Sequence, residues 1–360
     1  MRVILSAAVT ADGYLDDNTP QRLMISTEAD WRAVQLLRAS CDAILIGAET
    51  LRRDNPTLQL HDDEARRQRL ARGQNSEPAK VILTRSGALD PAMRLFTEGT
   101  AGKILFSPKD LPEFHGCATV ISSEGEEITA AFVITELEKR GIGRLLVEGG
   151  ASILDMFLRE GAADEVRLAV NPQLRLGRDR GGARFRFDPP ASADCRYECL
   201  DGMKVATYVL HPDTTTTDLE RLQEAIDESR RCIPCRSSYR VGALIVTCNG
   251  ECFKGYTHES SATHHAEQEA IRKALEAGAS LRGATIYSSM EPCSKRASEP
   301  ESCTQLILRH GFARVVFALY EPDRFVCCRG ALTLREAGLD VRCYPELGAQ
   351  VREINAHLWE

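Results

Sequence analysis

Three short motifs in the last third of the chain, His265-Ala266-Glu267, Pro292-Cys293 and Cys303, give the strongest indication of its fold and chemistry. The hydrophobic spacing predicts that the first motif opens one helix and that the cysteines open another, with a strand between them. One imidazole and two thiolates are a typical ligand set for catalytic zinc, which keeps its fourth position for water. Helix N-termini also stabilise thiolates through their free N–H groups. His265, Cys293 and Cys303 are therefore the predicted zinc ligands.

Glu267 follows the predicted histidine ligand by two residues. It is placed to take a proton from zinc-bound water, whose pKa the metal lowers toward about 7, and to deliver protons to a ring nitrogen and a leaving amine. The three motifs together resemble the signature of zinc-dependent nucleobase deaminases. His264 is an alternative ligand at this stage. Either motif alone is common by chance, but chance does not account for their order and their placement at helix starts.

Length, charge and cysteine content limit the class of protein. The 360 residues suffice for two domains of about 150 residues each. A net charge of −7 argues against a broad nucleic-acid surface. No apolar run approaches the ~20 residues that span a bilayer, and Asp12-Gly13 ends the first run too early for a signal peptide.

Nine of the thirteen cysteines follow residue 230, which indicates reduced thiols in a cytoplasmic protein with a metal site. Cys232-Ile233-Pro234-Cys235 lacks a second pair at zinc-ribbon spacing and is interpreted as a loop.

A proline and a polar run divide the chain. His211-Pro212-Asp213 precedes a run of four threonines, which predicts a domain over residues 1–212, a linker over 213–218 and a second domain over 219–360. In the first domain, strands are expected at 3–9, 42–46, 81–83, 104–106 and 144–147, helices at 28–38, 129–139 and 151–159, and a charged loop at 61–77. In the second, helices are expected at 219–231, 267–277 and 304–310, and strands at 241–247, 284–289 and 314–319. Such alternation predicts α/β domains with a largely parallel sheet in the first.

The second domain resembles a specific deaminase family. Met290-Glu291-Pro292-Cys293-Ser294, the long gap to Cys303, the stretch 311–316 and Glu321-Pro322-Asp323 are similar to the riboflavin-pathway deaminase over about residues 219–345. The resemblance implies a cytidine-deaminase-like, three-layer α/β/α fold and a phosphoribosylaminopyrimidine substrate that loses its ring amine. Two segments depart from the family. Ser238-Tyr239-Arg240 replaces an asparagine-proline pair, and the loop 294–302 lacks the family's histidines and threonine-proline.

The first domain resembles the reductase of the same pathway. Val147-Glu148-Gly149-Gly150-Ala151 joins a predicted strand to a helix, where glycines let the backbone approach a pyrophosphate. With Thr10-Ala11-Asp12-Gly13, the stretch 42–50 and Asp54-Asn55-Pro56, it resembles the riboflavin-pathway reductase, a relative of dihydrofolate reductase. The resemblance implies a dihydrofolate-reductase-like fold and NADPH as the donor that reduces the ribosyl group to ribityl.

The resemblance also implies site residues. Those for the cofactor are Thr50, Asp54, Arg85, Gly149, Gly150, Ala151 and Ser152, and those for substrate are Arg38, Leu58, Glu148 and Arg22. A guanidinium suits a 2′-phosphate, so Arg85 would favour NADPH, the alternative being a solvated loop arginine. His61 stands where the family has a second arginine for the substrate phosphate, and Arg22 and Met24 replace a serine and a tryptophan. Arg22 is predicted to supply the missing positive charge.

The sequence therefore predicts a bifunctional enzyme that binds Zn²⁺ and NADPH, with the reductase preceding the deaminase, the reverse of the common bacterial order. Its partner would be a small phosphorylated pyrimidine rather than nucleic acid or membrane, and a homodimer is expected. Two alternatives stay open. The same chemistries could act on another pyrimidine nucleotide or nucleoside, or one of the two domains could be inactive. A binding module without catalysis gives no reason for Glu267 beside a complete ligand set.

Overall fold

The chain folds into two units in a computed structural model that describes every residue except 20, 22, 297–298, 323–327 and 359–360. The N-terminal unit comprises Arg2–Val133 and Ile142–Pro212. The C-terminal unit comprises Asp213–Glu360 together with Met1 and Ile134–Gly141. The chain therefore passes from one unit to the other after Met1, after Val133, after Gly141 and after Pro212.

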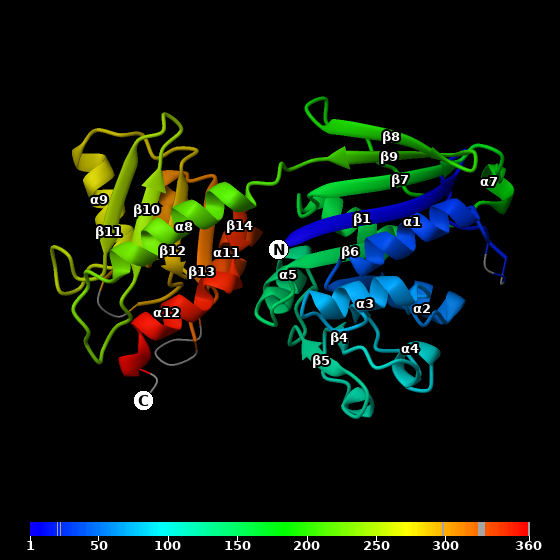
Figure 1. Ribbon diagram of the computed structural model, residues 1–360, viewed down its shortest axis with the longest axis horizontal. Coiled ribbons are helices and arrows are strands. Elements are labelled where there is room, and N and C mark those ends of the chain that lie inside the picture. The colour runs from blue at the N-terminus through cyan, green and yellow to red at the C-terminus, as the bar shows by residue number, and fades with distance from the viewer. Residues whose placement is uncertain (20, 22, 297–298, 323–327, 359–360) are drawn as a thin grey trace. The chain divides into compact units, whose positions relative to one another are not determined.

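A nine-stranded sheet forms the centre of the N-terminal unit (Figure 1). In spatial order its strands are β5 (Thr119–Ser122), β4 (Lys103–Ser107), β3 (Ala79–Leu83), β2 (Ala43–Gly47), β6 (Arg144–Gly149), β1 (Arg2–Thr10), β7 (Glu165–Asn171), β9 (Met203–Val209) and β8 (Asp194–Leu200). All neighbours from β5 to β7 are parallel, whereas β9 and β8 join as an antiparallel hairpin. The predicted parallel sheet is confirmed, and β5, β7, β8 and β9 are strands that the sequence reading missed.

Three helices were predicted for the N-terminal unit, at 28–38, 129–139 and 151–159, and all three are present, but the unit also contains helices that were not predicted. Its helices are α1 (Glu28–Ala39), α2 (Ala48–Asp54), α3 (Asp63–Ala71), α4 (Arg94–Thr97), α6 (Ala151–Arg159) and α7 (Gly177–Arg180), with a 3₁₀ turn at Pro112–Phe114. Helix α5 (Ala130–Glu138) begins in this unit, and its residues from Ile134 onward belong to the C-terminal unit. The prediction of a loop over 61–77 was wrong, because α3 lies within it. Asp62 caps that helix by accepting from the backbone N–H groups of Glu64 and Ala65. The buried guanidinium of Arg69 donates hydrogen bonds to the backbone carbonyls of Ala39 and Cys41. A charged residue therefore takes part in the buried face of this helix.

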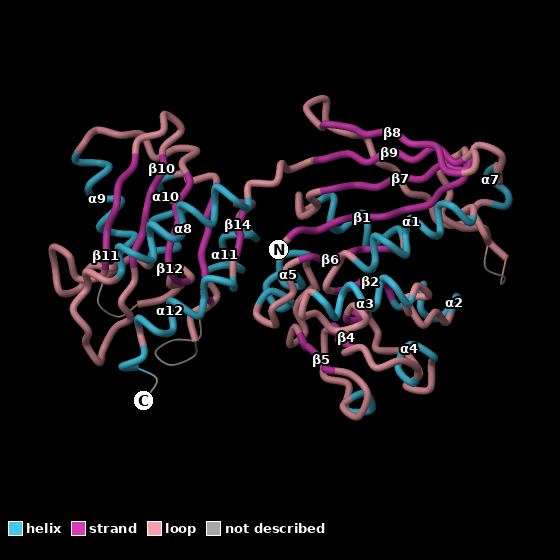
Figure 2. Tube along the Cα trace, in the orientation of Figure 1, coloured by secondary structure: helices cyan, strands magenta, loops and turns pink. Residues whose placement is uncertain are grey.

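The C-terminal unit is a three-layer sandwich (Figure 2). Its sheet runs in the order β11 (Cys252–Tyr256), β10 (Gly242–Val246), β12 (Thr285–Met290), β13 (Arg314–Leu319) and β14 (Asp340–Cys343). The helices are α8 (Thr215–Ser229), α9 (Ala266–Glu276), α10 (Cys303–His310), α11 (Gly330–Glu336) and α12 (Gly348–Ile354), with 3₁₀ turns at Pro345–Leu347 and Ala356–Leu358. Apolar residues of α9, α10 and α11 pack on one face of the sheet, and those of α8 and α12 pack on the other. The predicted three-layer fold is confirmed.

Residues of the same strand pack into both hydrophobic cores of this unit, one on each face of the sheet. On β13, Val315 and Phe317 belong to the core beneath α9, whereas Val316 and Ala318 belong to the core beneath α8. This alternation is the period of two expected of a strand whose two faces are both buried.

Helix α8 begins earlier than predicted. Thr215 is its first residue, so the last four residues of the expected linker 213–218 are helical. Buried Asp218 accounts for the difference, because it accepts hydrogen bonds from the hydroxyls of Thr214 and Tyr344 and pairs with Arg314. Arg314 and Tyr344 lie far along the chain, so an interpretation of the threonines from local sequence alone could not include them.

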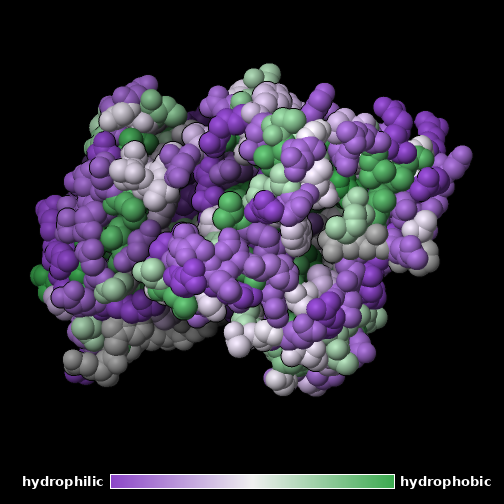
Figure 3. Space-filling model, turned by 45° about the vertical axis from the view of Figure 1, so that its right-hand side comes forward, coloured by the Kyte–Doolittle hydropathy of each residue, from purple (hydrophilic) through white to green (hydrophobic). Residues whose placement is uncertain are grey.

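Hydrophilic residues predominate on the face seen in Figure 3, and hydrophobic residues gather there only in patches. Among the described residues, no helix combines the length and the apolar character needed to cross a membrane.

Candidate active sites

The three predicted zinc ligands meet in the C-terminal unit. Their ligand atoms all lie within 4.8 Å of one another. His265 Nδ1 is 3.5 Å from the Sγ atoms of both Cys293 and Cys303. His265 immediately precedes α9 and Cys303 is the first residue of α10, as predicted. The prediction that Cys293 also lies at a helix start was wrong, because it lies in the loop three residues beyond β12. One nitrogen and two sulfur donors that face a common point fit a catalytic zinc ion.

Local structure prepares the cysteines for a metal. Ser302 and Gln305 form a capping box that fixes the start of α10, where Cys303 lies. The backbone N–H of Cys303 lies 3.5 Å from Cys293 Sγ. Hydrogen bonds with Cys303 and with His265 lower the pKa of the Cys293 thiol to about 4. The contact with Cys293 and burial raise the pKa of the Cys303 thiol, so of the two cysteines Cys293 is the one whose surroundings favour the thiolate, the form that binds zinc.

Glu267 lies beside the ligand cluster and is almost fully buried. Its Oε2 is 3.4 Å from Cys303 Sγ, and its Oε1 accepts a hydrogen bond of 3.0 Å from the Ser288 hydroxyl. Burial raises the pKa of the Glu267 carboxyl, which suits a group that both takes up and releases protons. Ser288 was missed by the sequence reading, because only the fold of β12 against α9 brings it to this carboxylate.

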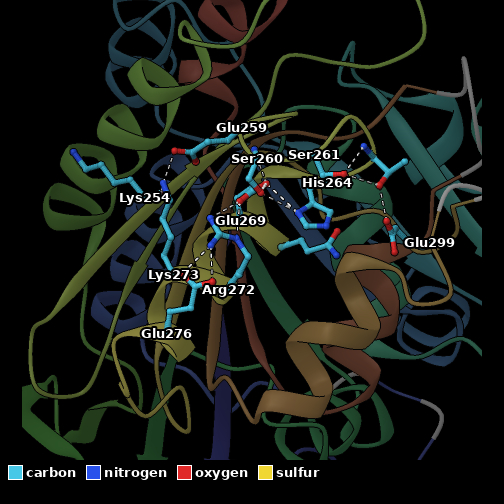
Figure 4. Close-up of polar contacts among 12 residues, drawn as sticks. Lys254, Glu259, Ser260, Ser261, His264, Glu269, Arg272, Lys273, Glu276 and Glu299 are labelled. Atoms are coloured by element: carbon cyan, nitrogen blue, oxygen red, sulfur yellow. Dashed lines mark hydrogen bonds and ion pairs between the residues drawn. The ribbon is translucent and has the colours of Figure 1, made fainter.

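A second buried carboxylate holds the loop that leads into His265 (Figure 4). Glu269 Oε1 accepts from the Ser260 backbone N–H at 2.9 Å, from the Ser260 hydroxyl at 2.5 Å and from His264 Nδ1 at 3.0 Å. Its Oε2 pairs with Arg272 at 3.0 Å. Within the described part of the chain the metal-ligand cluster consists of the three predicted residues. His264, the alternative ligand, points instead to Glu269.

Replacing Glu269 with alanine is expected to weaken zinc binding about 10- to 100-fold, the usual cost of losing a group that orients a ligand. The reason is that the loop from Ser260 to His264 loses its anchor. Competition with a chelator would measure the zinc affinity. Glu276→Ala is the matched control, because Glu276 also pairs with Arg272 from the same helix but is exposed. Equal zinc affinities in the two variants would contradict the assignment.

The loop between the two cysteine ligands lies against the start of α9. Arg296 donates to Gln268 Oε1 at 3.1 Å and to the carbonyl of Thr263. The Thr263 hydroxyl in turn donates to Glu299 Oε1 at 2.6 Å. The segment that departs from the family pattern is thus attached to the residues flanking His265 and Glu267.

The N-terminal unit holds a cavity of about 1070 Å³ at the carboxyl ends of β2, β3 and β6. Parallel α/β sheets commonly bind ligands at this edge. The predicted site residues that line the cavity are Arg38, Thr50, Asp54, Arg85, Glu148, Gly150, Ala151 and Ser152. Gly149 and Leu58 are not among its lining residues. Arg22 lies outside the described residues, and its contact with a substrate phosphate stays a prediction.

Two strand-to-helix turns form the cavity wall between β2 and β6. A Cβ on Gly150 would lie 3.3 Å from Thr50 Oγ1, and one on Gly47 would lie 3.1 Å from Ile153 Cγ1. Gly149 has φ +125°, a conformation that favours glycine. The turns therefore pack closely and present the N-terminal N–H groups of α6 to the cavity, a suitable place for a pyrophosphate.

Arg38 and Glu148 form a bidentate ion pair in the cavity wall. Arg38 Nε lies 2.7 Å from Glu148 Oε1 and Nη2 lies 2.6 Å from Oε2, with side-chain exposures of 7% and 13%. The guanidinium also covers the ring of Trp31 at 4.8 Å from its centroid. Two of the four residues predicted to face substrate are thus held together by this ion pair.

Leu58, which was also predicted to face substrate, binds the side chain of Lys80 through its backbone carbonyl. It has φ +53°, and its carbonyl accepts a hydrogen bond of 2.5 Å from Lys80 Nζ. Burial lowers the pKa of the Lys80 ammonium to about 8, and Glu77 lies 3.5 Å from it. Lys80 was missed by the sequence reading, which took β3 as an apolar strand.

His61 replaces an arginine of the family pattern. The backbone N–H of His61 donates to Gln35 Oε1, and the His61 side chain is exposed.

Two family models match the chain. Residues 1–191 match the RibD C-terminal domain, and residues 215–319 match the cytidine and deoxycytidylate deaminase zinc-binding region. The second match contains His265, Glu267, Cys293 and Cys303. The predicted resemblance to a reductase followed by a deaminase is therefore confirmed.

Individual relatives match one unit each. The C-terminal unit resembles a diaminohydroxyphosphoribosylamino-pyrimidine deaminase of Schizosaccharomyces pombe, 43% identical over 34% of this chain and 31% of that protein. The N-terminal unit resembles a 2,5-diamino-6-ribosylamino-4(3H)-pyrimidinone 5′-phosphate reductase of Methanothermobacter thermautotrophicus, 33% identical over 49% of this chain and 80% of that protein. A solved deaminase/reductase of Thermotoga maritima is 25% identical, with 58% of this chain and 56% of that chain covered and a TM-score of 0.48. The chain thus spans about a third of the deaminase's length and four fifths of the reductase's.

Proposed function

The chain belongs to the RibD C-terminal domain family, and from this we propose that it is a bifunctional enzyme of riboflavin-type biosynthesis. Its C-terminal unit would deaminate a phosphoribosylaminopyrimidine, and its N-terminal unit would reduce the ribosyl group to ribityl with NADPH. The main support for the proposal is that His265, Cys293 and Cys303 lie close together beside the buried carboxylate of Glu267.

Deamination exchanges the ring amine for a carbonyl, consuming one water and releasing ammonia. A zinc ion held by the three ligands would activate that water and lower its pKa. Glu267 takes the proton that the water loses and passes it to the ring nitrogen. It then carries the second proton to the leaving amine, and Ser288 holds the carboxylate in position throughout. Burial of Glu267 keeps bulk water from competing in these transfers.

Reduction needs NADPH and the open-chain ribosyl group side by side in the N-terminal cavity. NADPH supplies the hydride when bound. The turn at Gly150 and the start of α6 would hold its pyrophosphate, with Thr50 and Asp54 beside them. Arg38 and Glu148, which also line the cavity, would bind the substrate, with Arg38 attracting its phosphate.

Arg85 is proposed to select NADPH over NADH. It is exposed at the edge of the cavity, directly after β3 and Thr84. Arg85→Ala is expected to raise KM for NADPH about tenfold, equivalent to about 1.4 kcal/mol, and to leave KM for NADH unchanged. Arg67→Ala is the control, because Arg67 is an exposed arginine of α3 outside the cavity lining. Equal rises in both KM values for Arg85→Ala would show that Arg85 does not contact the 2′-phosphate.

The proposal is tested by measuring bound zinc and NADPH oxidation on one preparation, with the ribosylaminopyrimidine phosphate as substrate. Zinc near one per chain with substrate-dependent NADPH oxidation supports both activities. Zinc without NADPH oxidation would leave only the deaminase, and NADPH oxidation without zinc would leave only the reductase. A cytoplasmic location is part of the proposal, supported by the free thiols of the described cysteines.

A further inference from the structure

The N-terminal unit contains a further buried ion pair besides that of Arg38 and Glu148. Lys80 Nζ on β3 is 3.5 Å from Oε2 of Glu77, which lies shortly before that strand, and their side-chain exposures are 3% and 8%. Neither residue is among those that line the cavity. Lysine and glutamate are seldom buried, because a charge that leaves water costs free energy unless other groups compensate for it. The groups that surround the pair therefore decide its role.

The pair holds the chain segment 58–60. Lys80 Nζ donates to the Leu58 carbonyl at 2.5 Å, and Glu77 Oε2 accepts from the Leu60 backbone N–H at 2.9 Å. Leu58 has φ +53°, a left-handed conformation that costs free energy in a residue with a side chain and persists only where surrounding contacts hold it. These hydrogen bonds provide such contacts, and they also fix the Lys80 ammonium in place.

The same segment is attached to α1, the helix that carries Arg38. The backbone N–H of His61 donates to Gln35 Oε1 at 3.1 Å. Gln35 and Arg38 are three residues apart and therefore lie on the same side of the helix. Burial lowers the pKa of the Lys80 ammonium to about 8, and the charges of Arg38 and Glu148 also act on it. Lys80 is thus close to the ion pair in the cavity wall.

The two buried ion pairs balance in charge. Arg38 and protonated Lys80 carry two positive charges. Glu148 and Glu77 carry two negative charges, so the four groups are neutral together. If Lys80 lost its charge, the group would carry one net negative charge. Charges interact more strongly in a buried site than in water, so a phosphate that approaches Arg38 would then be repelled.

The other charged side chains near Lys80 are more exposed. Its neighbour in register on β2 is an isoleucine, and on β4 it is Lys103. The Lys103 ammonium donates to the Gly99 carbonyl at 3.1 Å in an exposed hydrogen bond. Arg66 of α3 pairs with Glu77 but is itself 33% exposed. Because water and salt screen exposed charges, the four buried groups dominate the local charge.

We propose that Lys80 is a positioning residue of the reductase, whose charge keeps the group around Arg38 neutral and so allows Arg38 to bind the phosphate of the substrate. This role rests on the proposed function of the N-terminal unit. Lys80 acts through Arg38, because it is not itself a lining residue of the cavity. Glu148 already neutralises Arg38, so the charge of Lys80 beside Glu77 decides whether the phosphate meets a neutral or a negative wall.

Removing one charge, and then two, tests the balance. Lys80→Met is expected to raise KM for the ribosylaminopyrimidine phosphate about tenfold, because the remaining groups carry a net negative charge, and to change kcat less than about twofold. Lys80→Met/Glu77→Gln is neutral again, so its KM should return to within about threefold of the wild-type value. Loss of contacts alone would make the double variant worse than the single one. No rise for Lys80→Met, or no recovery in the double variant, would overturn the proposal.

Two controls accompany these variants. Lys103→Met removes the exposed lysine of the neighbouring strand and should leave KM unchanged, whereas a rise equal to that of Lys80→Met would contradict a role for the buried charge. Ammonia release by Lys80→Met should equal that of the wild type, since the predicted zinc ligands lie in the other unit.

The wild-type chain provides a test that needs no loss of the Lys80 side chain. With a pKa of about 8, the Lys80 ammonium is charged at neutral pH and loses its proton above that value. KM for the phosphorylated substrate should therefore rise about fivefold between about pH 7 and about pH 9.5, where the phosphate stays a dianion because its second pKa is about 6. Lys80→Arg stays charged, so its KM should not change over this range. Parallel profiles of KM against pH in the two chains would contradict the role of Lys80.

Binding of ribose 5-phosphate separates this role from the reductase activity itself. Arg38 covers the ring of Trp31, so the fluorescence of Trp31 reports ligands that bind at Arg38 without any turnover. A Trp359→Phe background leaves Trp31 as the one tryptophan of the chain. The affinity should fall about tenfold from this parent to its Lys80→Met variant. If the wild-type chain fails to oxidise NADPH but this fall is seen, the proposed reductase is refuted and the role of Lys80 stands. Equal affinities would refute the role of Lys80 alone.

Discussion

Replacing Glu267 with glutamine is expected to lower kcat for deamination about 10³-fold, within the range that general acid–base catalysis supplies. The amide keeps the size of the side chain but cannot carry a proton from water to the ring nitrogen and the leaving amine. The hydrogen bond from Ser288 and the zinc ligands are unchanged, so zinc content should stay as in the wild type. Ammonia release measures the effect.

Two controls make the Glu267→Gln result specific. Glu276→Gln, on the exposed side of the same helix, should deaminate at the wild-type rate. NADPH oxidation by Glu267→Gln should also be unchanged, since the proposed reductase residues lie in the other unit. A Glu267→Gln variant that retains more than a tenth of wild-type kcat with full zinc would contradict the proposed proton carrier.

Replacing Arg38 with alanine is expected to destabilise the N-terminal unit by about 3–5 kcal/mol, the usual cost of leaving one member of a buried ion pair alone. Glu148 would lose both of its short hydrogen bonds, and Trp31 would lose the guanidinium that covers its ring. Thermal unfolding measures the stability. KM for the phosphorylated substrate should rise as well, since Arg38 lines the cavity.

The double variant Arg38→Ala/Glu148→Ala separates the two roles of the pair. It should recover part of the lost stability, because no buried carboxylate is left unpaired, but none of the lost substrate affinity. Arg32→Ala is the matched control on the same helix. Arg32 and Glu28 form an ion pair in which both side chains are exposed, so Arg32→Ala should lower the free energy of unfolding by no more than about 0.5 kcal/mol. If Arg38→Ala were as harmless as Arg32→Ala, the pair would not have the structural role assigned to it.

Local sequence was sufficient to identify the three proposed zinc ligands, which the fold brings together. His265, Cys293 and Cys303 lie at helix starts or shortly after a strand, and short motifs with regular spacing identify such positions. The same holds for α6, which occupies the predicted range Ala151–Arg159. Contacts between distant segments could not be predicted in this way. Ser288 donates a hydrogen bond to Glu267, and Lys80 donates one to the carbonyl of Leu58. Both contacts join segments that are distant in the sequence and meet only in the folded chain.

The exposure of its side chains explains why strand β8 was not predicted. Strand β8 has almost no buried residue, so it lacks the alternation of apolar and polar residues by which strands are recognised. The charged segment that forms α3 was misread for a related reason, because its buried face depends on Ala65 and on the guanidinium of Arg69 rather than on large apolar residues. In both cases the pattern that decides the structure is hydrogen bonding, which hydrophobic periodicity does not record.

The central claim is that one chain carries both chemistries, and the mass of the product tests it most directly. The protein would be incubated with 2,5-diamino-6-ribosylamino-4(3H)-pyrimidinone 5′-phosphate, with and without NADPH. Deamination adds about one mass unit and reduction about two. The proposed function predicts a gain of about one unit without NADPH, about three with it, and about two for Glu267→Gln with NADPH. A substrate that keeps its mass in the presence of zinc and NADPH, or gains the same mass with and without NADPH, would contradict it.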